Sequence, residues 1–124
     1  LDVTTRVGVT RESLMTWAAE SRAPLARMTT DMTRKAFEFA EKVEGHGLFY
    51  FHDPLAVLAA VDSSLLKVEP LHVSVEMAGR VSRGITIADR RPRTPEEKAR
   101  PNMHVAVDVD VDRTLSFLRN RLCP

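Results

Sequence analysis

The sequence predicts a domain of the α/β or α+β class, in which helices and strands pack as layers. The first half favours helices, because apolar residues such as Leu14 and Trp17 recur at steps of three and four. The second half favours strands, because apolar and polar residues alternate from Leu71 and again over residues 103–109. A chain of 124 residues is long enough for one modest core and too short for two of typical size.

Composition excludes several classes of protein. Hydrophobic residues at 44%, charged residues at 28% and a mean hydropathy of -0.19 are typical of a globular protein and exclude wholesale disorder. The formal charge of +1 gives no overall field toward nucleic acid or an anionic membrane, and no apolar run approaches the length of a membrane helix. The single Cys123 excludes an internal disulfide and favours a reducing, cytoplasmic setting.

Two helices are expected in the first third of the chain, after a short strand at residues 1–4. Thr10 is a suitable cap for the first helix, and Pro24 suits the first turn of the second, which is expected to end near Gly45. An apolar stripe of the second helix predicts the face that packs on the core. Its members are Leu25, Met28, Met32, Ala36, Phe39 and Val43.

A third helix is expected after the aromatic run at residues 48–51. Asp53 is a suitable cap for it, and Pro54 suits its first helical position. Residues 55–61 have no polar face, which predicts burial on all sides. The other expected helices and strands are barely enough to cover such a helix on every side. Together with a start at Leu1 rather than Met, this indicates part of a larger fold.

The second half is expected to form three strands and a closing helix. The strands are expected from Leu71 to Met77, through Ile85 and Ile87, and over residues 103–109. The charged, proline-rich residues 90–101 predict an exposed loop. The closing helix contains Leu115, Leu118 and Leu122, and its cap is Asp110 or Asp112.

His52 and Asp53 are the strongest candidates for chemistry. An imidazole and a carboxylate stand side by side where an aromatic run meets an apolar helix. Asp53 can ligate a hard cation such as calcium, and His52 can act as a general acid or base near neutral pH. The neighbouring aromatic residues, Tyr50 among them, can line a pocket for a flat ring. The alternative stays open that Asp53 only caps the helix and His52 is an ordinary hydrogen-bonded loop residue.

Residues 80–100 are a second, weaker candidate. They hold seven basic and three acidic side chains, an excess that can contact phosphate or an acidic partner. A solvated loop is the simpler interpretation, because no aromatic residues interleave with the charges.

Several stretches, in order along the chain, carry a resemblance to a known family. They are Leu1-Asp2-Val3-Thr4, His52-Asp53-Pro54-Leu55-Ala56-Val57, Ala60-Val61-Asp62-Ser63-Ser64-Leu65, Val73-Ser74-Val75-Glu76, the segment from Ser82 to Arg90, and the segment from Pro101 to Asp112. Together they resemble the C-terminal part of the inosine-uridine preferring nucleoside hydrolase family, over nearly the whole chain.

The resemblance implies an open α/β sandwich around a mostly parallel sheet, with a small antiparallel extension. Residues 1–124 are then the C-terminal portion of a single nucleoside hydrolase domain. The implied activity is calcium-dependent hydrolysis of the N-glycosidic bond of ribonucleosides, giving ribose and a free base. Position by position, Asp53 matches a calcium-ligand Asp, and His52 matches the adjacent His that protonates the leaving purine in some members. Tyr50 is an expected pocket residue.

The sequence also departs from the family. The Asp-x-Asp-x-x-x-Asp-Asp motif, which supplies the catalytic base and most acidic calcium ligands, is absent from these residues, as is the Asn/Glu segment that grips the ribose. The calcium site is therefore incomplete, and this segment alone is expected to be inactive. The expected partners are a nucleoside substrate, the N-terminal segment of the same fold and further copies in a homo-oligomer, with no nucleic acid and no membrane. The alternative is a non-catalytic, truncated relative that acts as a binding or oligomerisation module.

Overall fold

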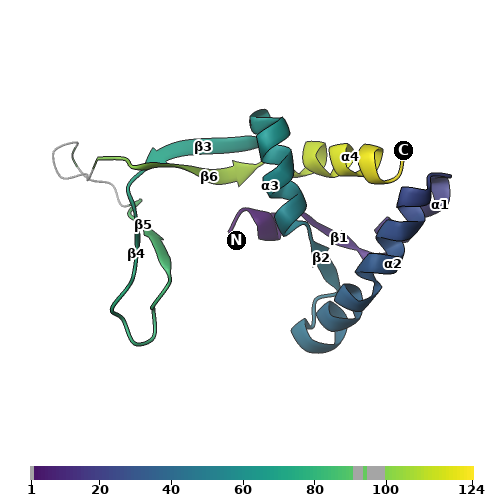
Figure 1. The fold of residues 1–124 in the computed structure, drawn as a ribbon, viewed down its shortest axis with the longest axis horizontal. Coiled ribbons are helices and arrows are strands. Elements are labelled where there is room, and N and C mark those ends of the chain that lie inside the picture. The colour runs from purple at the N-terminus through teal and green to yellow at the C-terminus, as the bar shows by residue number, and fades with distance from the viewer. Residues whose placement is uncertain (1, 91–93, 95–99) are drawn as a thin grey trace. The chain divides into compact units, whose positions relative to one another are not determined.

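The computed structural model describes residues 2–90, 94 and 100–124 and divides the chain into two compact units. The first unit is Leu1–Leu66 with Val109–Pro124, and the second is Lys67–Asp108. The elements, shown in Figure 1, are β1 (Gly8–Thr10), α1 (Arg11–Glu20), α2 (Pro24–Phe39), β2 (Leu48–Tyr50), α3 (His52–Val61), β3 (Leu66–Leu71), β4 (Val73–Val75), β5 (Thr86–Ala88), β6 (Met103–Val109) and α4 (Val111–Leu122).

In the first unit, β1 and β2 form an antiparallel pair. Strand β1 leads into α1, and β2 leads into α3. Two helix starts are confirmed: the side chain of Thr10 accepts a hydrogen bond from the Ser13 amide at the start of α1, and Pro24 begins α2. The expected end is also confirmed, because a π-helical turn after α2 ends at Gly45 with a φ of 75°. The strand expected at residues 1–4 is wrong, since Thr4–Arg6 form a 3-10 turn and the strand begins at Gly8.

One hydrophobic core holds the first unit together. Its largest fully buried apolar side chains include Phe37 from α2, Phe51 between β2 and α3, and Leu14 from α1. The complete buried cluster is Val7, Val9, Leu14, Phe37, Phe51, Leu55, Leu58, Leu65, Val109 and Leu118. Because Phe51 is both buried and bonded through its amide to the Val7 carbonyl at 2.9 Å, the start of α3 is fixed against the β1 segment.

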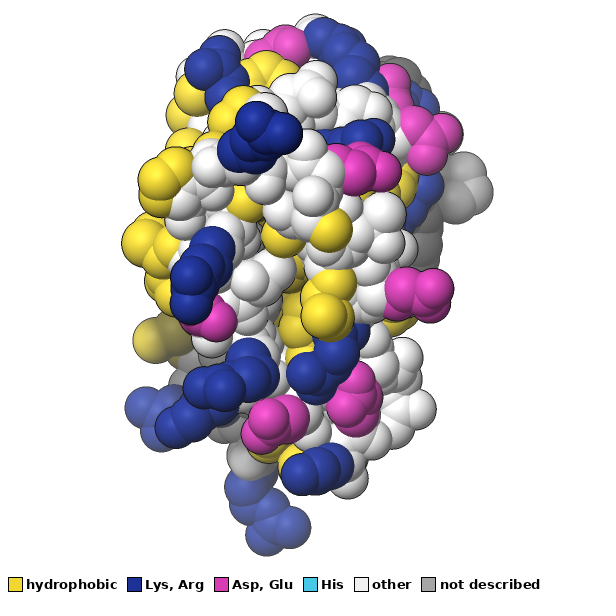
Figure 2. All heavy atoms as spheres, turned by 90° about the vertical axis from the view of Figure 1, so that its right-hand side faces the viewer, with side chains coloured by type: hydrophobic (Ala, Val, Ile, Leu, Met, Phe, Trp, Pro, Cys, Tyr) yellow, Lys and Arg dark blue, Asp and Glu magenta, His cyan; other side chains and the backbone are white. Residues whose placement is uncertain are grey.

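The apolar stripe of α2 does not face the core, which corrects the expectation from its periodicity. The buried residues of the helix are instead Ala26, Thr33 and Phe37, and the two small side chains allow close approach of neighbouring elements. Ala36 of the expected stripe is half-buried, and its other five members are exposed: Leu25 38%, Met28 53%, Met32 71%, Phe39 54% and Val43 67%. Figure 2 shows hydrophobic side chains at the surface, interspersed with lysines and arginines.

Helix α3 is buried along one side only, so burial on all sides is wrong for the part of the chain that the structure describes. Leu55 and Leu58, one turn apart, enter the core. Val57 and Val61 remain 64% and 68% exposed. The apolar composition predicted that every side of the helix is shielded from water. The described residues cover only the side that carries Leu55 and Leu58.

The second unit contains two short strand pairs. Strand β4 pairs antiparallel with β5, with Val73 opposite Ala88, and Figure 1 shows β3 beside β6 running in the opposite direction. The expected single strand from Leu71 to Met77 is wrong, because the strand begins at Leu66 and is broken at His72. Strand β6 is confirmed. Most of the loop expected at residues 90–101, and with it much of the basic segment, lies outside the described residues.

Val73 joins three stretches of the second unit. Its backbone pairs with β5, and its amide and carbonyl both bond the side-chain amide of Asn102, at 2.8 and 2.9 Å. A carboxamide can replace a peptide group in this way because it carries one donor and one acceptor side by side. Asn102 also donates its backbone amide to the Leu71 carbonyl at 3.1 Å. The segments before β4 and before β6 are thereby held together.

Helix α4 closes the first unit with the cap that the sequence predicts. Asp110 accepts a hydrogen bond from the Arg113 amide at 3.0 Å. The Arg113 guanidinium in turn reaches the carboxylate of Asp62 at 2.7 Å and the hydroxyl of Ser64 at 2.8 Å. The start of α4 is therefore linked to the turn that follows α3. Over the described ranges, no helix has both the length and the apolar character to cross a membrane.

Candidate functional site

His52 is the first residue of α3 and its side chain is half-buried. The ring nitrogen Nδ1 lies 2.6 Å from the hydroxyl oxygen of Thr4, a residue 48 positions earlier in the chain. The buried Phe51 before it and the buried Leu55 after it fix the backbone on both sides. The imidazole is therefore held in place, rather than being a freely rotating loop side chain.

Tyr50 lies beside His52 in a short row of rings. The ring of Tyr50 is centred 5.8 Å from the ring of His52 and 5.2 Å from the ring of His46. Gly8, opposite Tyr50 in the antiparallel pair, leaves room for the phenol: a Cβ at Gly8 would lie 3.0 Å from two carbons of the ring. The absence of a side chain at Gly8 thus lets the Tyr50 ring lie directly on β1.

His46 has a defined hydrogen-bond arrangement at the end of this row. Its Nδ1 accepts the Leu48 amide at 3.1 Å, and its Nε2 lies 2.9 Å from a carboxylate oxygen of Glu44. A neutral imidazole that accepts at Nδ1 carries its proton on Nε2. His46 is exposed.

Asp53 is exposed in the first turn of α3. The backbone N–H groups and the dipole of a helix N-terminus favour a carboxylate at this position. The cap residue is Phe51, however, and no side-chain cap bond is formed, so the interpretation of Asp53 as the cap is wrong. Its carboxylate is available as an oxygen ligand.

The described residues do not by themselves form a calcium site. Calcium takes six to eight oxygen ligands, with several carboxylates in high-affinity sites. Among the residues that the structure describes, no group of three or more His, Cys, Asp or Glu side chains is arranged to hold a metal ion. The Asp53 carboxylate fits the chemistry of one hard ligand, and the described residues supply no complete site around it.

Thr4 and Gly8 are the site features that sequence reasoning missed. Thr4 stood within a stretch that carried the family resemblance, and Gly8 was not singled out. Their importance depends on contacts with His52 and Tyr50 across more than forty residues. Local periodicity and capping patterns carry no signal for such contacts.

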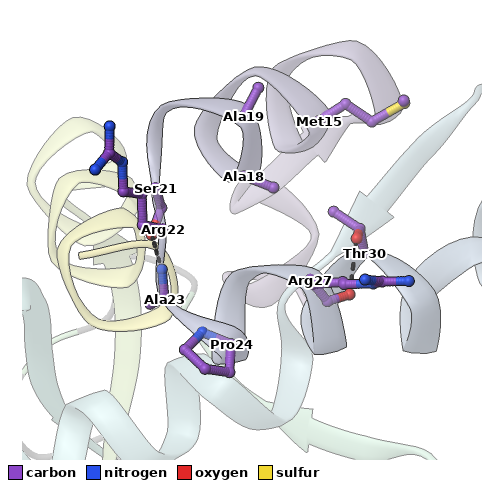
Figure 3. Close-up of a pocket in the computed structure, with 9 residues that line it drawn as sticks. All are labelled: Met15, Ala18, Ala19, Ser21, Arg22, Ala23, Pro24, Arg27 and Thr30. Carbon is purple, nitrogen blue, oxygen red and sulfur yellow. Dashed lines mark hydrogen bonds between the residues drawn. The ribbon is translucent and has the colours of Figure 1, made fainter.

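A hollow between α1 and α2 lies apart from these side chains. It has a volume of about 470 Å³ and is lined by Met15, Ala18, Ala19, Ser21, Arg22, Ala23, Pro24, Arg27 and Thr30 (Figure 3). Its hydroxyls already form hydrogen bonds: Ser21 accepts the Ala23 amide and donates to the Pro124 carbonyl, and Thr30 donates to the Arg27 carbonyl. None of His52, Tyr50 or Asp53 lines it, so it is not the location of the candidate chemistry.

This chain is similar in fold to solved structures and in sequence to curated proteins. A plant nucleoside hydrolase matches 99% of the chain with a TM-score of 0.82 and 25% identity. A purine-preferring ribonucleoside hydrolase from Gardnerella vaginalis matches 98% with a TM-score of 0.77 and 32% identity. The inosine-uridine preferring nucleoside hydrolase of Crithidia fasciculata is 36% identical over 62 residues, and a probable ribonucleoside hydrolase of Dictyostelium discoideum is 30% identical over 71 residues.

The chain spans only part of each of these proteins. It covers 39% and 37% of the two solved structures, and the aligned segments cover 19% and 20% of the two curated relatives. The family model for inosine-uridine preferring nucleoside hydrolase matches residues 1–116, which is nearly the whole chain. The chain therefore belongs to the inosine-uridine preferring nucleoside hydrolase family.

Proposed function

We propose that this chain is the C-terminal part of a ribonucleoside hydrolase. The proposed reaction breaks the bond between C1′ of ribose and a nitrogen of the base. Water adds across that bond: its hydroxyl joins C1′ and a proton goes to the base. The match to the family over residues 1–116 carries the proposal. The His52 imidazole, held at the start of α3, supports it.

In this proposal His52 protonates the departing base, which is otherwise a poor leaving group. An imidazole suits the task because its charge changes near neutral pH. Tyr50, whose ring neighbours that of His52, forms part of the wall against the base. The transition state has oxocarbenium character at the ribose, so the protein must also hold the sugar and activate water.

We further propose that the reaction depends on calcium, with Asp53 as one carboxylate ligand. A bound calcium ion would supply a centre for binding hydroxyls and water. Because Asp53 alone gives weak binding, the proposal requires an N-terminal part of the same fold for the other ligands and the general base. We propose a cytoplasmic location, since the one cysteine indicates no disulfide framework.

The test is hydrolysis of inosine by the intact protein in the presence of calcium. His52→Ala should lower kcat by about 10²-fold or more, the range for loss of a general acid. His104→Ala, which changes an exposed histidine on β6, should leave kcat within about twofold. Equal activity of His52→Ala and the unaltered protein would refute the role of His52.

Two further assays test the metal and the incomplete site. Asp53→Asn should raise the calcium concentration for half-maximal activity by about tenfold, because affinity follows ligand charge. An unchanged calcium concentration for half-maximal activity would show that Asp53 is not a calcium ligand. The 124-residue segment alone should not hydrolyse inosine, and calcium-stimulated turnover by it would contradict the incomplete site.

A second candidate function is an oligomerisation module, and the exposed stripe of α2 favours it. The occupant that we propose for the stripe is α2 of a second copy. Exposed charges beside the stripe alternate as Arg27, Asp31, Lys35 and Glu38. An antiparallel pair centred near Thr33 places Arg27 opposite Glu38 and Asp31 opposite Lys35, so the charges complement one another.

The oligomeric state of the intact protein distinguishes this candidate. Met28→Glu with Met32→Glu puts charge into the stripe and should convert dimers to monomers in light scattering after size exclusion. Thr5→Glu with Arg6→Glu, at exposed residues of the 3-10 turn, controls for added charge. A monomeric unaltered protein, or a dimer that survives the stripe substitutions, would refute pairing through α2.

A further inference from the structure

We propose that Thr4 is a positioning residue for His52, and that its hydroxyl oxygen accepts the Nδ1 proton, so that the ring is held with Nε2 as the nitrogen that gives its proton to the substrate. This inference rests on the proposed function, in which His52 gives a proton to the departing base. It adds a partner for that histidine on the 3-10 turn Thr4–Arg6, which no local sequence pattern indicated.

The first support is the geometry of the contact. The Thr4 hydroxyl oxygen and Nδ1 of His52 are 2.6 Å apart and the contact is partly buried. That separation is at the short end for hydrogen bonds, so the two atoms share a proton in one direction or the other. A half-buried bond of this kind restricts rotation of the ring about its last side-chain torsion.

The second support is the rigidity of both partners. The amide of Val7 donates to the Thr4 carbonyl at 3.1 Å, which closes the turn. The amide of Phe51 donates to the Val7 carbonyl at 2.9 Å, which joins the turn to the residue before His52. The hydroxyl and the ring are therefore carried by two segments that are bonded to each other, three residues after Thr4 and one residue before His52.

The third support is the chemistry of imidazole. A neutral ring has one nitrogen that donates and one that accepts. If Nδ1 donates to the Thr4 oxygen, Nε2 is the nitrogen that carries the second proton of the imidazolium, and release of that proton to the departing base leaves the ring neutral. Within the described ranges Nε2 has no hydrogen-bond partner, so it is the nitrogen left for a substrate. In the opposite direction the neutral ring would carry its one proton on Nε2, and release of that proton would leave an imidazolate anion, which is too strong a base to form near neutral pH.

The direct test is the tautomer of His52 in the intact protein, measured from ring nitrogen-15 chemical shifts at a pH where the imidazole is neutral. The expected result is one dominant tautomer with the proton on Nδ1, donated to the Thr4 oxygen. Thr4→Val keeps the shape and removes the hydroxyl, so both tautomers should become populated. Thr4→Ser keeps the hydroxyl and should restore the single tautomer. A dominant proton on Nε2, or a tautomer unchanged by Thr4→Val, would overturn the inference.

The kinetic test separates this inference from the proposed function. Thr4→Val should lower kcat on inosine by about fivefold, the change that corresponds to one ordinary hydrogen bond, with KM little changed. With p-nitrophenyl riboside, whose leaving group needs no proton, the variant should stay within about twofold of the unaltered protein. Equal loss on both substrates would indicate a merely structural role for Thr4. Absence of hydrolysis by the unaltered protein would instead refute the proposed function.

Discussion

Replacing Gly8 by alanine tests how closely the Tyr50 ring lies on β1. The new Cβ would lie 3.0 Å from ring carbons Cδ1 and Cε1, where ordinary contacts are 3.4–4 Å. Gly8 is not among the glycines with positive φ, so the backbone itself accepts alanine. The cost therefore comes from crowding, because the ring or the strand must move by a few tenths of an ångström.

The size of the effect follows from two opposing contributions. Crowding in a packed site costs about 1–3 kcal/mol. Replacing glycine by alanine at a compatible backbone stabilises by about 0.4–1 kcal/mol, because the unfolded chain loses freedom. Gly8→Ala should therefore destabilise the protein where the Tyr50 ring is present. In a Tyr50→Ala background, where the ring is gone, the same change should be neutral or slightly stabilising.

The assay is a double-mutant cycle by urea unfolding of the intact protein. The coupling between Gly8 and Tyr50 should be about 1–3 kcal/mol. Tyr50→Phe is the matched control, because it keeps the ring and should leave the cost of Gly8→Ala unchanged. An equal effect of Gly8→Ala in the unaltered protein and in the Tyr50→Ala background would refute direct contact of the ring with the strand.

Three further predictions concern stability. The Ser64 hydroxyl and amide, assisted by Arg113, lower the pKa of Asp62 from its ordinary value of 3.8. The resulting stabilisation is present above that value and is lost as pH falls through the lower folded-state pKa. Asp62→Asn should reduce the loss of unfolding free energy at low pH. An unchanged loss would count against the hydrogen bond between Ser64 and Asp62. Gly45→Ala should cost about 1 kcal/mol, because the φ of 75° disfavours a side chain although nothing lies within 4 Å; urea unfolding checks this, and no change would be contrary to the reasoning. Phe37→Ala should cost about 3–5 kcal/mol in the same measurement, and a loss below 1 kcal/mol would show that the ring is not a core residue.

Local signals predicted the positions of several helix ends. Thr10, Pro24 and Asp110 are found where caps and first-turn residues were expected. These predictions succeeded because a cap satisfies backbone groups only a few residues away, so its chemistry is contained in a short stretch of sequence. The end of α2 near Gly45 succeeded for the same reason.

Long-range packing defeated the other predictions. The period of the α2 stripe correctly indicated a helix, but it did not decide which face meets Phe51 and the rest of the core. Two of the three buried residues of α2 are the small Ala26 and Thr33, and a pattern of large apolar residues does not reveal a face built largely from small ones. The residues of the candidate site were indicated by sequence, whereas the Thr4 contact that holds His52 became visible only in the structure.

Val73 also determines where this protein can accept new sequence. The chain leaves the β4–β5 pair at Ala88 and returns at Asn102, and both of these residues contact Val73. Because Ala88 and Asn102 both contact Val73, the two ends of the intervening segment are held together whatever its length. Doubling the length of a flexible loop costs only about 0.6 kcal/mol of closure entropy. An epitope or a reporter domain inserted between Ala88 and Asn102 should therefore leave both strand pairs intact. Such an insertion would allow the protein to be purified or imaged, and it is far along the sequence from Thr4 and His52.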